Sequence, residues 1–346
     1  MMLESNTNIL DKIKDLAKKE AKKLYIYENL RDCPLDSHLP LFQICGSNIK
    51  VGCFKKHDNA PRMMFWANYL KNYVLPVQKS GSLDGFYNIE LHDSYTHLKD
   101  VMKARTSGFG NANSYHLNKY KNCLVWSKDR NDEDVVLLPD IYHIANFGNR
   151  LQMHKDSYLW DQKCDKIGFW GTTTGNTDPL MNDRIQTCEW FYKQDPRHLI
   201  SDCYITKIAQ MKPHDILEQC PLFPHIFKEP VSIPYQYKYK FLLDIPGNTC
   251  SWDRVPLIMN SNSLLFKMPC QDMCFYYPLL KENEHFVQVD KNDVFKKREY
   301  YLNNPKEAQF IISNARSFSQ TVFTSETARL YINELFREAA NLRALT

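Results

Sequence analysis

Short apolar runs alternate with amphipathic segments along the second half of the chain. KIGFWG, at residues 166–171, is an apolar run of strand length, and the TTTGNTD that follows it has the composition of a loop. Residues 179–194 then carry apolar side chains near helical period, with Asp178 placed to cap that helix. Another apolar run of strand length follows at 199–206. The predicted order is strand, loop, helix and strand.

The same alternation continues towards the C-terminal end. KFLLDIPG ends a predicted strand at Gly247, residues 251–260 predict a short helix, and SLLFK at 263–267 predicts a further strand. Two longer helices are predicted at 304–320 and 325–345. Because strand and helix alternate, we expect an α/β fold built on a parallel sheet.

The first half of the sequence is less regular. Residues 1–30 intersperse lysines with apolar positions at helical spacing. They predict an amphipathic helix docked on the protein by its apolar stripe, with a weak peripheral membrane contact as the alternative. Strands are predicted at 86–93 and 123–128.

Polar residues cluster at 151–166, which is where a domain boundary is expected. The predicted organisation is an N-terminal domain at 1–155, a C-terminal domain at 156–325, and a final helix at 326–346 that packs across the junction between them.

Length, charge and cysteine content narrow the class of protein. A chain of 346 residues is long enough for two domains. Its net charge of +4, from 44 basic and 40 acidic residues, is too small for the basic face that nucleic-acid binding needs, but suits a small anionic ligand. No apolar run is long enough to span a bilayer. The 11 cysteines lack metal-site or disulfide spacing and no N-x-S/T sequon occurs, so we expect a cytoplasmic protein without a metal site.

Two predicted strand-to-helix turns are rich in small hydroxyl residues. GTTTGN runs from Gly171 to Asn176, and GNTCS runs from Gly247 to Ser251. Ligands of open parallel sheets bind outside the carboxyl ends of the strands, where such loops offer N–H groups and hydroxyls to phosphate oxygens. Arg254, in the first turn of the predicted helix at 251–260, could pair with a diphosphate. Neither loop matches a P-loop or a dinucleotide fingerprint, and ordinary capped turns are the alternative.

The order of residues after 237 resembles that of glycosyltransferase family 90, which includes capsule-associated and lipopolysaccharide-modifying transferases and protein O-glucosyltransferases. The matching positions are Lys238, Tyr239, Gly247, Ser251, Arg254, Ser263, Leu264, Tyr277, Pro278, Leu280, Lys281, His285 and Val289. Upstream, FWGTTTGNTDPL and VWSK are similar to further family segments. NIELHDSY resembles the strand that ends in the family's catalytic aspartate, which is Asp93 here.

The resemblance implies a GT-B fold, in which two Rossmann-like domains face each other across a cleft. The C-terminal domain would hold a UDP-sugar, with glucose or xylose as the sugar, and the N-terminal domain would receive a glycan, glycolipid or protein acceptor. The implied reaction is inverting and needs no metal or other cofactor, with Asp93 as the general base that removes the acceptor hydroxyl's proton.

The residues expected to bind the nucleotide-sugar all belong to the two loops or the helix start after them. They are Gly171, Thr172, Thr173, Thr174, Gly247, Asn248, Thr249, Ser251, Asp253 and Arg254. Two departures from the family pattern fall among them. Trp170 and Thr173 stand where the family has arginines, and SWDR is one residue longer than the family's Ser-x-Arg.

The sequence is also compatible with two other functions. The replacement of an arginine by Thr173 is compatible with a catalytically silent protein that binds a nucleotide-sugar or glycan. DED, at 132–134, resembles the metal-binding DxD of the other large glycosyltransferase fold and would make Asp132 and Asp134 metal ligands.

Overall fold

The computed structural model describes the chain at residues 6–24, 26, 41–52, 60–79, 81–89, 124–133, 135–140, 143–144 and 147–345. These residues divide into two compact units. The first, which we call the parallel-sheet unit, comprises residues 148–270 and 279–323. The second comprises the described residues between 6 and 147 together with 271–278 and 324–345.

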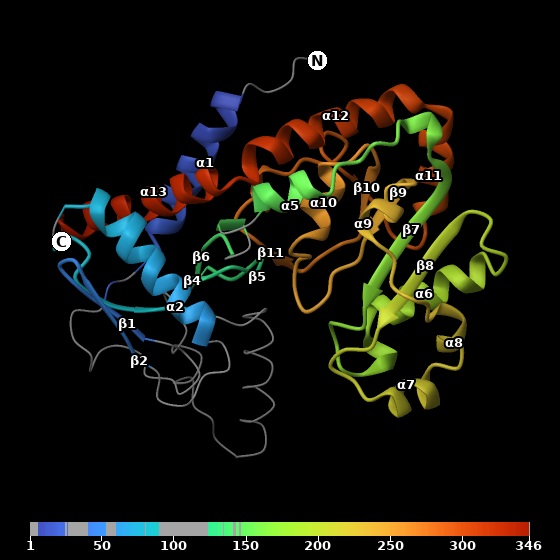
Figure 1. Cartoon of the computed structure of the whole chain (residues 1–346), viewed down its shortest axis with the longest axis horizontal. Helices are drawn as coiled ribbons and strands as arrows, with labels where there is room; N and C mark the ends of the chain where they lie inside the picture. Colours follow the sequence, from blue (N-terminus) through green and yellow to red (C-terminus); the bar gives the residue numbers. More distant parts are fainter. Residues whose placement is uncertain are drawn as a thin grey trace. The chain divides into compact units, whose positions relative to one another are not determined.

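The parallel-sheet unit is built on five parallel strands (Figure 1). Their order across the sheet is β12-β10-β9-β7-β8. The bounds of the strands are β7 Cys164–Thr172, β8 Ser201–Lys207, β9 Tyr239–Asp244, β10 Leu264–Lys267 and β12 Val287–Gln288. From β7 the chain passes to β8 on one side and then returns to β9 on the other. The boundary between β7 and β9 is therefore a topological switch point, and the predicted α/β class with a parallel sheet is confirmed.

Helices connect these strands and cover the sheet. α6 packs against β8, and both α10 and α12 pack against β10. The helices of this part of the chain are α5 Phe147–Met153, α6 Asp183–Gln194, α7 Pro213–Gln219, α8 Phe223–Ile226, α9 Ile233–Gln236, α10 Arg254–Met259, α11 Val294–Asn303 and α12 Pro305–Val322, with shorter helical turns η4 Trp160–Gln162, η5 Pro179–Met181 and η6 Tyr277–Leu279. The strands and helices predicted for residues 166–267 and the helix predicted at 304–320 are thus present, with shifted ends.

The core of this unit forms because its strands are apolar on both faces. On one face of the sheet Ile167 and Phe169 of β7 and Phe241 of β9 are 0% exposed. On the other face Trp170 of β7 and Leu242 of β9 are at most 6% exposed. Strands covered on both faces read as continuous apolar runs rather than alternating ones, as KIGFWG and KFLL do in the sequence.

The predicted helix at 179–194 is divided in two, which corrects the cap assigned to Asp178. The Asp178 side chain accepts a 3.0 Å hydrogen bond from the N–H of Leu180 and caps only the short turn η5. Asn182 then caps α6, because its Oδ1 accepts a 3.1 Å hydrogen bond from the N–H of Ile185. Two capping side chains four positions apart each start a new helical segment, so the longer helix begins after the second one.

The second unit contains an antiparallel sheet in the order β2-β1-β3 and two short strand pairs. The sheet strands are β1 Leu41–Cys45, β2 Asn48–Gly52 and β3 Gly85–Asn88. The pairs join β4 Leu124–Val125 to β6 Val136–Leu137 and β5 Lys128–Asp129 to β11 Asp272–Met273. The helices are α1 Asn6–Ala21, α2 Ala60–Tyr69 and α13 Ser325–Arg343, with the turns η1 Leu70–Val74 and η2 Leu75–Val77.

The strands predicted in this half lie only partly within the described residues. Of the run predicted at 86–93, β3 ends at Asn88 and Ile89 forms an isolated bridge with Leu124, whereas residues 90–93 lie outside the described part of the chain. The run predicted at 123–128 forms two separate strands, β4 and β5, that pair with different partners.

α1 docks by its apolar stripe, as predicted. Ile9, Ile13 and Ala17 are at most 4% exposed, and the helix packs against α13 within the second unit. The side chain of Glu20 on the same helix is buried as well, and its Oε2 accepts a 2.9 Å hydrogen bond from the N–H of Leu137. Residues three and four positions apart lie on the same face of a helix, so these four residues form one buried stripe along α1.

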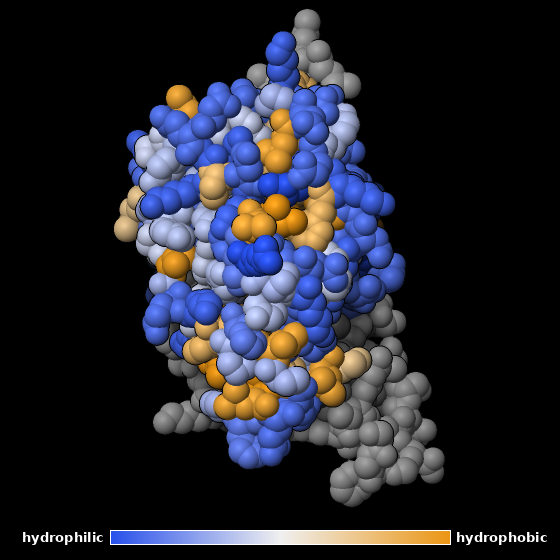
Figure 2. Space-filling view, turned by 90° about the vertical axis from the view of Figure 1, so that its right-hand side faces the viewer, coloured by the Kyte–Doolittle hydropathy of each residue, from blue (hydrophilic) through white to orange (hydrophobic). Residues whose placement is uncertain are grey.

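The outer surface seen in Figure 2 mixes polar and apolar side chains. Apolar side chains gather there in two main groups, each bordered by polar ones. Large apolar side chains that are more than half exposed in the parallel-sheet unit include Leu180, Met181, Leu199 and Leu217. In the described part of the chain, no helix combines the length and the apolar character that crossing a bilayer demands.

Candidate functional site

The two hydroxyl-rich loops meet at the switch point of the parallel sheet. The loop after β7 and the loop after β9 are joined by a 2.9 Å hydrogen bond from the N–H of Gly175 to Oδ1 of Asn248. β7 and β9 are neighbouring parallel strands, so their carboxyl ends lie at the same edge of the sheet. The structure thus brings together two segments that lie some seventy positions apart in sequence.

A glycine is required where the two loops approach most closely. A Cβ atom on Gly247 would lie 2.8 Å from Oγ1 of Thr174 and 2.9 Å from Nη2 of Arg184. Carbon atoms do not approach other heavy atoms this closely, so a larger residue must displace the side chains of Thr174 and Arg184. Gly175 has a φ of +131°, a conformation that residues with a side chain rarely adopt.

Arg184 is a component of the site that was not among the residues expected from sequence. It extends from the first turn of α6, and its guanidinium donates hydrogen bonds to the carbonyls of Ile245 and Pro246 at 3.1 to 3.2 Å and to Oγ1 of Thr174 at 2.6 Å. Burial lowers the pKa of Arg184. Its position at the start of the helix after GTTTGN parallels that of Arg254 after GNTCS, and this was the signal in the sequence.

Arg254 lies at the first position of α10, as expected, and faces β7. Its Nη2 donates a 2.5 Å hydrogen bond to the carbonyl of Trp170, and its guanidinium stacks over the ring of Phe169 at 4.5 Å. Burial lowers the pKa of Arg254 as well. Among the described residues no carboxylate lies within 4.0 Å of either Arg184 or Arg254, so both cations are held near each other without an ion-pair partner.

The nearby carboxylates are paired with other cations. Asp253, expected in the site, forms a 2.5 Å ion pair with Arg150, which belongs to α5. Asp244, at the end of β9, forms a 3.1 Å ion pair with Lys267 at the end of β10. Burial raises the pKa of Asp244, but the charges of Lys267 and Arg254 together with hydrogen bonds from Ser251 and Lys267 outweigh burial, and the pKa is lowered. The local field therefore stays positive around the two arginines.

The hydroxyl side chains of the two loops have different partners. Thr173 is fully buried, and its Oγ1 both donates to the carbonyl of Ala209 and accepts from its N–H. Oγ1 of Thr172 lies 3.2 Å from Oγ1 of Thr174. Ser251 is buried, and its hydroxyl lies beside the carboxylate of Asp244, whose pKa it helps to lower. The side chains of Thr173 and Ser251 thus have partners within the fold, whereas Thr172 and Thr174 retain hydrogen-bonding capacity.

The backbone of Thr249 shapes the second loop. Its carbonyl accepts a 3.1 Å hydrogen bond from the N–H of Gly247, which turns the chain tightly after β9. The expected glycine at the other strand end, Gly171, lies within β7, where a Cβ would lie 2.5 Å from the ring of Phe169. Both glycines are therefore packing positions, and their role towards a ligand is limited to leaving the backbone accessible.

A cavity of about 340 Å³ opens at the same edge of the sheet. Its walls come from the start of α6 and from the segments after β9, β10 and β12, and they include Asp183, Thr187, Ile245, Pro246, Asp290 and Lys291. Ile245 and Pro246 are the residues whose carbonyls bind Arg184, so the cavity adjoins the arginine site. Its volume lies within the range of about 300 to 1,000 Å³ that is common for ligand pockets.

The remaining sequence-predicted residues lie elsewhere or outside the described structure. Asp93 and Asp134 are outside the described residues. Asp132 lies in the turn after β5, and its N–H donates to the carbonyl of Asp129 at 3.0 Å. No group of three His, Cys, Asp or Glu side chains within the described ranges is arranged to hold a metal ion.

Several solved structures show a distant likeness to the chain. The C-terminal domain of LpcC, a glycosyl transferase group 1 family protein from Francisella tularensis, is 12% identical, with 54% of this chain and 96% of that one covered and a TM-score of 0.33. WaaG, a glycosyltransferase involved in lipopolysaccharide biosynthesis, is 10% identical over 69% of this chain and 73% of its own, with a TM-score of 0.39. TarM is 12% identical over 60% of this chain and only 40% of its own, with a TM-score of 0.38.

Comparison of the sequence with known protein families identifies one family. None of the curated proteins matches the chain significantly. The sequence model of Glycosyl transferase family 90 matches residues 216–346, a stretch that contains β9, the loop with Gly247, α10 and Arg254. The resemblance to glycosyltransferase family 90 that the sequence predicted is therefore confirmed, over residues 216–346 of this chain.

Proposed function

We propose that this chain is an inverting, metal-independent GT-B glycosyltransferase that moves a sugar from a UDP-sugar to a hydroxyl of a glycan, glycolipid or protein. The observation that carries this proposal is the pair of guanidinium groups of Arg184, which is buried, and Arg254, which is partly buried. Neither has a carboxylate within 4.0 Å in the described structure, and both lie at the switch point of a parallel sheet. Unpaired buried cations are costly, and an anionic ligand at that point offsets the cost.

The diphosphate of the donor would lie against the loops after β7 and β9. Phosphate oxygens would accept from the loop N–H groups, from the hydroxyls of Thr172 and Thr174, and from the two guanidinium groups. Negative charge grows on the diphosphate as the bond to the sugar breaks, so these donors stabilise the transition state more than the ground state. The adjoining cavity at Ile245 and Pro246 offers space for the nucleoside.

Arg184 lies where this chain lacks two arginines that the family pattern has. The family's arginines beside Gly171 are replaced here by Trp170 and Thr173. Arg184 nevertheless contacts that same loop, with hydrogen bonds to the carbonyl of Thr172 at 3.3 Å and to Oγ1 of Thr174 at 2.6 Å. We propose that it supplies the positive charge that the loop itself lacks, which favours an active transferase over a silent binding protein.

Asp93 would be the general base of this reaction. In an inverting transfer a carboxylate removes the proton of the acceptor hydroxyl while its oxygen attacks the anomeric carbon, and UDP leaves from the opposite face. This role rests on the resemblance of NIELHDSY to the family's segment. An Asp93→Asn protein that still binds UDP should transfer sugar far more slowly than the wild type.

A panel of UDP-sugars tests the proposal. UDP-glucose, UDP-xylose, UDP-galactose and UDP-N-acetylglucosamine would each be scored for thermal stabilisation and for release of UDP. A donor at about 100 times its dissociation constant stabilises the native state by about 2.7 kcal/mol. The proposal predicts stabilisation and UDP release with at least one donor. Stabilisation without release would instead favour the silent binding protein, and activity that chelator abolishes would favour the metal-dependent alternative at Asp132 and Asp134.

A further inference from the structure

A second cavity, of about 410 Å³, lies at the opposite edge of the same sheet. Its walls come from the segment before β7, from the turn before β10 and from one face of α12, and they include Leu159, Trp160, Asn262, Ser313, Arg316 and Gln320. β7 joins the two edges with nine residues, which at about 3.3 Å per residue separate the cavity from the arginine site by roughly 30 Å. The cavity is therefore not part of the proposed donor site.

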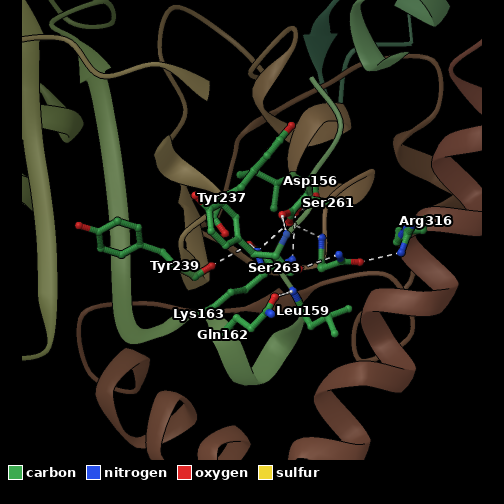
Figure 3. Close-up of polar contacts among 12 residues, drawn as sticks. Asp156, Leu159, Gln162, Lys163, Tyr237, Tyr239, Ser261, Ser263 and Arg316 are labelled. Carbon is green, nitrogen blue, oxygen red and sulfur yellow. Dashed lines mark hydrogen bonds and ion pairs between the residues drawn. The ribbon is translucent and has the colours of Figure 1, made fainter. Parts of the chain in front are cut away.

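A buried ion pair holds the wall of this cavity (Figure 3). Nζ of Lys163 lies 2.7 Å from Oδ2 of Asp156, and the two side chains are 0% and 2% exposed. Lys163 also donates to the carbonyl of Tyr237 and to Oγ of Ser263. Because each charge is neutralised and hydrogen-bonded, the segment at 156–163 is fixed to the sheet in one arrangement.

The same ion pair orients Asn262. Oδ2 of Asp156 accepts a 2.8 Å hydrogen bond from the N–H of Asn262, and the Asn262 amide donates to the carbonyl of Tyr158 at 2.8 Å. Its Oδ1 then accepts a 2.6 Å hydrogen bond from Nη1 of Arg316, which reaches across from α12 (Figure 3). The Arg316 guanidinium is thereby positioned at the cavity with its other N–H groups still available.

The face of α12 that lines the cavity is polar but carries no acid. Gln309, Ser313, Arg316, Ser317 and Gln320 recur at three- and four-residue spacing and so share one face of the helix. No hydrogen bond or ion pair within the described structure involves the side-chain groups of the two glutamines and two serines, and no carboxylate there pairs with Arg316. The cavity thus offers hydroxyl, amide and guanidinium groups together.

This combination selects among ligand classes. An anion such as phosphate is usually held by several cations or a helix N-terminus, whereas this cavity has one guanidinium and uses the middle of α12. An apolar ligand would leave these polar groups unpaired. A pyranose presents hydroxyls that both donate and accept along its edge and C–H groups on its face. The cavity matches it with amides, hydroxyls and Arg316 for the edge and the apolar side chains of Leu159, Trp160 and Ile312 for the face.

We propose that this cavity binds a pyranose unit of a glycan, at a point remote from the reacting sugar. The ligand class deepens the proposed function, since a glycan acceptor that extends beyond the reacting end would gain affinity from a second contact. The site itself depends only on the cavity and its polar groups, so it is tested without any donor.

Saturation-transfer NMR with methyl β-glucoside, methyl β-xyloside, maltose and xylobiose tests the site directly. We expect at least one of these sugars to bind with a millimolar dissociation constant, Arg316→Ala to weaken that binding by about tenfold or more, and Ser313→Trp, which fills the cavity, to abolish it. Lys306→Ala, an exposed change on α12 outside the cavity, should leave binding unchanged. UDP-induced stabilisation, measured on the same variants, should remain at the wild-type value.

The possible results separate the two proposals. Equal sugar binding by the wild type and both cavity variants, or no binding of any of the four sugars, would overturn the second site. Inorganic phosphate that binds at Arg316 while the sugars do not would overturn the ligand class. If the wild type does not bind UDP but does bind a sugar in a manner that depends on Arg316, the proposed donor site is overturned and the role of the cavity stands.

Discussion

Asn248 Oδ1 accepts a hydrogen bond of 2.9 Å from the N–H of Gly175, across 73 positions of sequence. This bond joins the loop after β7 to the loop after β9 at the switch point of the sheet. It brings the hydroxyl side chains of both loops to one place and leaves Arg184 and Arg254 as the cations beside them. The proposed diphosphate site depends on this meeting of the loops.

Gly247→Ala should damage the proposed site more than it damages the fold. The new Cβ would lie 2.8 Å from Oγ1 of Thr174 and 2.9 Å from Nη2 of Arg184, so it should displace both groups. We expect a loss of about 1 to 3 kcal/mol in the free energy of unfolding and a decrease of about tenfold or more in affinity for UDP. Urea unfolding and UDP titration measure the two effects.

Gly46→Ala is the control for this substitution. Gly46 has a φ of +56° but nothing within 4 Å of its Cβ position, so the change strains the backbone of the second unit without crowding a neighbour. It should lower stability by about 1 kcal/mol and leave UDP affinity unchanged. Equal UDP affinities of the Gly247→Ala protein and the wild type would show that the loop contact does not shape the site.

Much of the parallel-sheet unit followed from sequence because its strands are continuous apolar runs. KIGFWG and KFLL are buried on both faces, and apolar runs of this kind identify strands without knowledge of their neighbours. The position of β9 beside β7 did not follow, because strand order depends on contacts distant in sequence. Arg184 was missed for the same reason, since its main partners, the carbonyls of Ile245 and Pro246, lie some sixty positions away.

The split of the helix at 179–194 illustrates a local limit of sequence reasoning. Asp178 and Asn182 are both good capping residues, and apolar periodicity alone does not decide which of them starts the main helix. The tertiary bonds of Asn182 decide it, because its amide also donates to the carbonyls of Thr173 and Asn176 at 3.0 and 2.8 Å. The cap therefore also fixes the loop after β7.

Lys163→Met should strongly destabilise the parallel-sheet unit. The substitution leaves the carboxylate of Asp156 buried without a cation, and removing one partner of a buried pair costs about 3 to 5 kcal/mol. Lys166→Met is the matched control, because Lys166 forms a 3.0 Å ion pair with Asp202 but is 30% exposed. That control should lose no more than about 1 kcal/mol. Similar losses in the two variants, measured by urea unfolding, would contradict the role given to the buried pair.

Asp195 should make stability depend on acid pH. Burial raises the pKa of its carboxyl, but hydrogen bonds from the N–H groups of Ile200, Leu199 and Ser201 outweigh burial and lower the pKa below 3.8. A folded-state pKa below the unfolded one gives stability that is present at neutral pH and is lost as pH falls through the folded-state value.

Asp195→Asn should reduce the free energy of unfolding at neutral pH by about 1 to 3 kcal/mol, since a weaker acceptor replaces the carboxylate. The variant should also lose less stability than the wild type when the pH falls from neutral to below 3.8. Asp161→Asn, at an exposed carboxylate, serves as the control and should follow the wild-type curve. Parallel curves for the Asp195→Asn protein and the wild type would refute this assignment.

The most direct measurement of the central claim is a calorimetric titration of UDP into the wild-type chain, Arg184→Gln and Arg197→Gln. Arg197 is exposed and outside the site, so its variant controls for the loss of one positive charge. A charge-assisted hydrogen bond contributes about 1.5 to 3 kcal/mol, so we predict that Arg184→Gln weakens UDP binding by about tenfold to a hundredfold while Arg197→Gln binds as the wild type does. Equal affinities of the wild type and the Arg184→Gln protein, or no UDP binding by the wild type, would contradict the account.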